Sequence, residues 1–118
     1  MEYIFVCSAG KYRSPVAAEV ALGLAVKHGI REFKSDFLGI NCVDFGQIEG
    51  VSRRLNKADI VFVMEQYMAT KLIDYFGIPS KKIYNLEIED CYPIREYPQL
   101  RRELERILTE KLEPFFIR

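Results

Sequence analysis

The chain has 118 residues, 49% of them hydrophobic, so it is long enough and apolar enough to bury the core of one domain. Its 17 Lys and Arg residues balance 17 Asp and Glu residues, and a net charge of zero gives no electrostatic footprint for nucleic acid or an anionic membrane. Cys7, Cys42 and Cys91 are widely spaced and the chain has one histidine, so we expect no metal site, no cofactor and no disulfide scaffold.

The first expected element is a strand at residues 3–6, because its β-branched and aromatic residues suit a strand that is buried on both faces of a parallel sheet. A loop of small residues follows from Cys7. Ser14 and Pro15 then predict the N-cap and the first position of a helix that runs to about Lys27, where Gly29 ends it.

Further strand patterns lie at residues 33–40, 58–64 and 82–86, and helical patterns lie at 49–56, 65–76 and 97–114. Strands that alternate with helices predict a parallel sheet covered on both faces. We therefore predict an α/β fold: one domain over residues 1–118, with a small flavodoxin-like sheet of four strands in the order 2-1-3-4. Ligands in such folds bind beyond the carboxyl ends of the strands where the strand order reverses, and the loop after Cys7 occupies that place.

The loop itself carries a chemical pattern, since Cys7 is followed after five residues by Arg13 and then by Ser14. The spacing alone arises easily by chance, but here it lies between a predicted buried strand and a predicted helix. Inward-pointing backbone N–H groups and a helix N-terminus bind anions, and the planar guanidinium of Arg13 can bind two phosphate oxygens. The same surroundings favour the nucleophilic thiolate of Cys7, to which the Ser14 hydroxyl can donate. The sequence therefore predicts a phosphate-binding loop with a nucleophilic cysteine.

Cys7-Ser-Ala-Gly-Lys-Tyr-Arg13-Ser-Pro resembles the catalytic loop of the low-molecular-weight protein tyrosine phosphatase family, and is most similar to a short branch of predicted phosphatases. The segment from Asp59 to Glu65 resembles the family's third strand, and residues 88–92 occupy the setting of the family's aspartate. The resemblance implies catalytic roles for Cys7, Arg13, Ser14 and Asp90. It also implies phosphate binding by Ser8, Ala9, Gly10, Lys11, Tyr12 and Arg13, and a substrate contact by Tyr92.

The chain departs from the family's pattern at three positions. Gly10 stands where the family often has asparagine, and glycine suits a left-handed backbone there equally well. Tyr12 replaces a second cysteine, and Asp90 is followed by Cys91 instead of proline. The acidic cluster around Asp90 would by itself be interpreted as a solvated loop, so Glu89 stays open as the alternative general acid.

The implied function is phosphomonoester hydrolysis through a cysteinyl-phosphate, with a phosphorylated protein or a small aryl phosphate, foremost phosphotyrosine, as substrate. Thiol-coupled arsenate reduction and a non-catalytic module that binds phosphate or phosphopeptides are the alternatives. Among the other cysteines, we expect Cys42 in the core, and Cys91 is a candidate for a protective disulfide with Cys7.

The first residues carry no basic segment, and the apolar run after them is too short for a signal peptide. No stretch approaches the about 18 apolar residues that a membrane helix needs. We therefore expect a cytoplasmic protein without nucleic-acid or membrane partners, and a monomer or a weak homodimer supported by Phe115 and Phe116.

Overall fold

Four parallel strands form the centre of the molecule, in a computed structural model that describes residues 1–91, 94 and 96–117. The strands are adjacent in the order β2-β1-β3-β4, which confirms the predicted sheet. Val6 in β1 lies opposite Leu38 in β2 and Val63 in β3, so the carboxyl ends of these strands meet at one edge. The strands are β1 (Glu2–Cys7), β2 (Lys34–Gly39), β3 (Ile60–Val63) and β4 (Ile83–Asn85).

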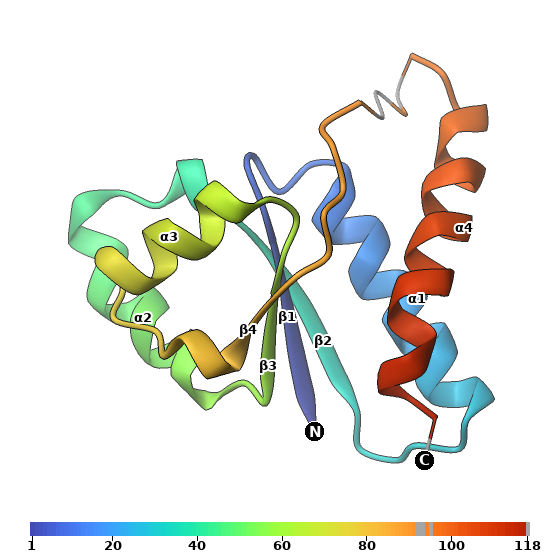
Figure 1. Ribbon diagram of the computed structural model, residues 1–118, viewed down its shortest axis with the longest axis horizontal. Coiled ribbons are helices and arrows are strands. Elements are labelled where there is room, and N and C mark those ends of the chain that lie inside the picture. Colours follow the sequence, from blue (N-terminus) through green and yellow to red (C-terminus); the bar gives the residue numbers. More distant parts are fainter. Residues whose placement is uncertain (92–93, 95, 118) are drawn as a thin grey trace.

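The helices cover both faces of the sheet, as Figure 1 shows: α1 and α4 pack together on one face, and α2 and α3 lie on the other. They are α1 (Arg13–Lys27), α2 (Ile48–Lys57), α3 (Gln66–Asp74) and α4 (Gln99–Leu112). In the part of the chain that is described, none of them is both long enough and apolar enough to span a bilayer.

The core lies between these layers and explains the apolar sequence of the inner strands. Residues 3–7 of β1 are all buried, because β1 has neighbours on both sides and helices on both faces. The rings of Phe5 and Phe62 stack with centroids 5.0 Å apart across β1 and β3. Helix α4 turns Leu104, Leu108 and Leu112 into the core, at the spacing expected for one helical face.

The element boundaries differ from the sequence expectation by at most two residues, and one difference is chemically informative. Helix α1 begins at Arg13, with Tyr12 as its N-cap, so the prediction that Ser14 caps the helix is wrong. The Ser14 hydroxyl lies 2.9 Å from the Sγ of Cys7 instead. The end of the helix is as predicted, since Gly29 follows it in the left-handed conformation with φ of 66°.

Candidate active site

The loop of residues 8–12 joins β1 to α1 at the carboxyl edge of the sheet, the upper end of the sheet in Figure 1. Its shape depends on two glycines that touch across the end of β2. Gly10 has φ of 69°, as expected for a left-handed position, and a Cβ there would lie 2.9 Å from the nitrogen of Gly39. A Cβ on Gly39 would lie 2.4 Å from the carbonyl carbon of Ala9, closer than atoms can approach. The loop can therefore close against β2 only because neither residue has a side chain.

Cys7 ends β1 with its thiol under this loop, and only 2% of the residue is exposed. Its Sγ accepts a hydrogen bond from the N–H of Gly10 at 3.1 Å and lies 2.9 Å from the Oγ of Ser14. A thiolate can only accept, so in that form of Cys7 the Ser14 hydroxyl is the donor. Two donors thus face the sulfur at the start of α1, where the helix dipole also favours negative charge.

Arg13 is 2% exposed, and its guanidinium is held on one edge by residues from distant segments. Its Nη1 donates to Oε1 of Glu65 and to the carbonyl oxygen of Ile88, both at 2.8 Å. Its Nη2 donates to the Oγ of Ser8 at 3.2 Å. Glu65 therefore compensates the buried charge of Arg13. The other edge of the guanidinium, with Nε and Nη2, lies nearer the loop, where Nη2 contacts Ser8.

Glu65 was not assigned a role by the sequence, although it is the nearest carboxylate to Arg13. It lies two residues beyond the end of β3 and is the N-cap residue of α3, and β3 is the neighbour of β1 in the sheet. A polar residue at the end of the strand next to β1 was the available signal, because adjacent parallel strands bring such residues to the same edge.

Asp90 reaches the site along a segment that continues beyond β4. The N–H of Leu86 donates to Val63 and the N–H of Ile88 donates to Met64, each at 2.8 Å, so this segment crosses the end of β3. Leu86 and Ile88 are buried, and they anchor the chain just before Asp90. The carboxylate of Asp90 is 63% exposed, and its Oδ1 lies 3.8 Å from the Nε of Arg13.

These groups surround a cavity of about 80 Å³, which we call the loop hollow. One water in the liquid takes up about 30 Å³, so the hollow has room for one phosphate-sized group. Ser14 lies fully buried behind Cys7, Glu89 is exposed away from the hollow, and Tyr92 lies outside the described residues. The residues that line the hollow are Cys7, Ser8, Ala9, Lys11, Tyr12, Arg13 and Asp90.

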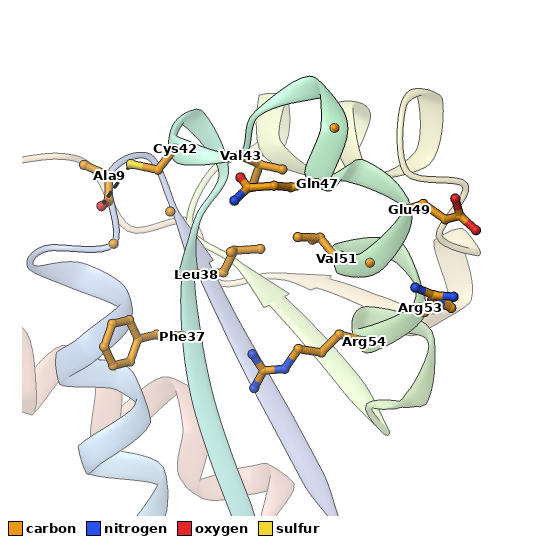
Figure 2. A pocket seen from close by; sticks show the side chains of 14 residues that line it. Ala9, Phe37, Leu38, Cys42, Val43, Gln47, Glu49, Val51, Arg53 and Arg54 are labelled. Carbon is orange, nitrogen blue, oxygen red and sulfur yellow. Dashed lines mark hydrogen bonds between the residues drawn. The ribbon is translucent and has the colours of Figure 1, made fainter.

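A second hollow of about 760 Å³ lies between β2 and α2 and meets the loop at Ala9 and Gly10. Figure 2 shows Leu38 and Val51 pointing toward one another across it. Although it is larger, its lining contains neither Cys7 nor Arg13. The loop hollow is therefore the candidate active site.

Cys42 lines the second hollow and is exposed, so the expectation that it belongs to the core is wrong. It lies in the short 3-10 turn of Ile40–Cys42 after β2, where the chain turns outward. Its Sγ lies 3.6 Å from the carbonyl oxygen of Ala9, a contact drawn in Figure 2. Cys91 is also exposed, and all three thiols are free, so the structure holds no bond between Cys7 and Cys91.

No protein-family model matches the chain, and no curated protein matches its sequence. Solved structures match its fold. The YwlE arginine phosphatase of Bacillus subtilis, in a mutant with a phosphorylated active-site serine, gives a TM-score of 0.72 at 20% identity, over 98% of this chain and 95% of that chain.

Two protein tyrosine phosphatases are similarly close. The enzyme from Entamoeba histolytica, with Hepes in the active site, gives a TM-score of 0.72 at 19% identity, over 98% of this chain and 94% of that chain. The low-molecular-weight enzyme from Bacillus subtilis gives 0.70 at 21%, over 97% and 98%. The chain therefore has the fold of the low-molecular-weight protein tyrosine phosphatases along almost its whole length.

Proposed function

We propose that this protein is a cysteine-dependent phosphomonoester hydrolase that acts on aryl phosphates, foremost phosphotyrosine, in a protein or a small molecule. The observation that carries the proposal is the arrangement of Cys7, Arg13 and Asp90 around one hollow of about 80 Å³. The fold shared with solved arginine and tyrosine phosphatases supports it.

In the first step, the thiolate of Cys7 attacks phosphorus, so that an S–P bond forms as the P–O bond to the leaving group breaks. The loop N–H groups and the Nε and Nη2 of Arg13 bind the non-bridging oxygens, whose charge they stabilise in the transition state. Asp90 donates its proton to the leaving oxygen.

In the second step, Asp90 takes a proton from a water molecule that attacks the cysteinyl-phosphate. The S–P bond breaks, inorganic phosphate is released, and Cys7 leaves as a thiolate. Ser14 contributes here, because its hydroxyl at 2.9 Å can donate to the sulfur as negative charge returns to it.

Asp90 is a better candidate for the acid than Glu89, since Asp90 lines the hollow and Glu89 does not. Matched variants test this difference. With an alkyl-like, poor leaving group, Asp90→Asn should lower kcat by about 10²- to 10⁴-fold, the usual contribution of a positioned acid. Glu89→Gln should stay within about twofold of the unaltered protein. The reverse result would assign the role of general acid to Glu89, and the proposed roles of Cys7 and Arg13 would stand.

The nucleophile is tested with aryl phosphate hydrolysis by Cys7→Ser, with Cys91→Ser as the matched cysteine control. We expect turnover to fall to background in the first variant and to persist in the second. Full activity of Cys7→Ser would refute the proposal. Phosphate binding without turnover in the unaltered protein would favour the binding module, and thioredoxin-coupled reduction of arsenate would favour the reductase.

A further inference from the structure

Lys11 places a positive charge on the wall of the loop hollow. It lies in the middle of the loop, it is exposed, and it lines the hollow together with Arg13 and Asp90. Within the described ranges, it forms no ion pair with a carboxylate, whereas Arg13 is paired with Glu65. Its charge is therefore available to a substrate.

A second free cation lies beside the loop. The Nζ of Lys71 in α3 lies 3.2 Å from Oδ1 of Asn41 and 5.8 Å from the ring centre of Tyr67. The N–H of Asn41 donates to the carbonyl oxygen of Ser8 at 2.9 Å, which joins this cluster to the loop. Lys71 also forms no ion pair among the residues that the structure describes.

We infer that Lys11, supported by Lys71, makes the site select phosphorylated residues that are flanked by carboxylates, so that the substrate is an acidic phosphopeptide segment. The inference rests on the proposed function and adds its substrate class. Asp90 must carry a proton to act as the acid, so it offers Lys11 no negative charge at the moment when substrate reacts. A carboxylate on the substrate can then supply the negative charge beside Lys11.

The same charges disfavour phosphoarginine. Its guanidinium is attached directly to phosphorus, so a bound phosphoarginine would bring a cation to the mouth of the hollow, close to Lys11 and Arg13. Like charges in contact oppose binding, and no side chain of opposite charge other than Asp90 lines this hollow among the described residues. The substrate named for one solved relative is therefore not the substrate that this site favours.

The effect has the size of exposed charge pairs, about two- to fivefold for each flanking carboxylate at low salt. It is screened at high ionic strength, because the Debye length falls from about 30 Å at 0.01 M to about 3 Å at 1 M. A preference caused by shape would not change with salt.

The test uses phosphotyrosine peptides that differ only in their neighbours, which are glutamate, alanine or lysine, and a phosphoarginine peptide in the alanine background. The ratio of kcat/KM between the glutamate and lysine peptides is measured for the unaltered protein, for Lys11→Gln and for Lys34→Gln. Lys34 is an exposed lysine at the opposite end of β2 and is the matched control. We expect a ratio of about ten at low salt, a fall to about three in Lys11→Gln, and no change in Lys34→Gln.

A ratio near one, a ratio unchanged by Lys11→Gln, or faster turnover of phosphoarginine than of the alanine peptide would overturn the inference while leaving the hydrolase intact. If the unaltered protein hydrolyses none of the peptides, the same ratio is measured as binding to Cys7→Ser by calorimetry. Tighter binding of the glutamate peptide would then uphold the charge selection although the proposed hydrolysis fails, and binding without preference, or none, would overturn it.

Discussion

Replacing Glu65 with glutamine removes a charge beside Arg13 but keeps a side chain of the same shape that can still accept a hydrogen bond. Glu65 is 32% exposed, Arg13 is 2% exposed, and their contact is 2.8 Å long. Arg13 stays charged and can still donate to the glutamine oxygen, so the substitution removes the attraction between two opposite charges, which at about 4 Å is about 1 kcal/mol in water and about 4 kcal/mol near a protein surface. We therefore expect Glu65→Gln to lower the free energy of unfolding by about 1–2 kcal/mol.

Phosphate should reverse part of this loss. Without Glu65 the buried guanidinium lacks a counter-charge, and a phosphate in the loop hollow would supply one. Because a ligand that binds only the folded state stabilises it by mass action, saturating phosphate should raise the melting temperature of Glu65→Gln by more than that of the unaltered protein. At about 4 °C for each kcal/mol, the deficit without phosphate is about 4–8 °C.

Thermal unfolding followed by circular dichroism, with and without phosphate, measures both quantities. Glu103→Gln is the matched control, since Glu103 pairs with Arg106 on the exposed face of α4 and should show no deficit that phosphate restores. The assay of aryl phosphate hydrolysis should show kcat/KM reduced about tenfold or more in Glu65→Gln, because Arg13 loses its fixed orientation. A deficit that is identical with and without phosphate, together with unchanged kcat/KM, would refute a positioning role for Glu65.

Three further variants test the loop, the residue behind Cys7 and an ion pair of β2. Gly39→Ala should displace the loop, destabilise the fold by about 2 kcal/mol or more and abolish phosphate binding. Gly50→Ala, in a helix with open space around it, should be neutral or stabilising. Chemical denaturation compares the stabilities of the two variants, and calorimetry compares their phosphate binding. Ser14→Ala should lower kcat about tenfold or more in steady-state assays and leave KM within about threefold, because its hydroxyl faces the nucleophile and not the substrate. Burial raises the pKa of Asp36, but the hydrogen bond from Arg54, a backbone N–H and the charge of Arg54 outweigh it and hold the pKa below its usual value of 3.8. Because the folded-state pKa is lowered, the pair of Asp36 and Arg54 stabilises the fold above about pH 4, and this contribution is lost as the pH falls further. In urea unfolding, Asp36→Asn should be less stable than the unaltered protein by under about 1 kcal/mol at pH 7 and equally stable near pH 2.

The sequence reveals the parts of the site that are local in the chain. Cys7, Arg13 and Ser14 lie within eight positions between a buried strand and a helix, and a loop of that kind can be recognised from spacing and residue type. The strand order was likewise predictable, because alternating strands and helices permit few arrangements of a small parallel sheet.

The parts that depend on tertiary contacts were not predictable in the same way. Glu65 becomes the partner of Arg13 only because β3 lies next to β1. Its place after a predicted strand was a signal, but a distance of 52 residues in the sequence does not indicate which side chain it pairs with. Cys42 was predicted to lie in the core, but it is exposed. The direction of its side chain is set by a single 3-10 turn, which hydrophobic periodicity does not report.

The hydrogen bonds of the Arg13 guanidinium also link the candidate site to the folding of the sheet. Its two shortest hydrogen bonds reach residues 52 and 75 positions away in the sequence. The guanidinium therefore gains both acceptors only after β3 has joined β1 and the segment beyond β4 has joined β3. A chain with either segment out of register would leave a buried donor of this guanidinium without one of its acceptors, which costs about 1–3 kcal/mol or more. Arg13, which is proposed to bind phosphate, thus disfavours incompletely formed sheets. Phosphate binding is therefore expected only after the last strand has docked.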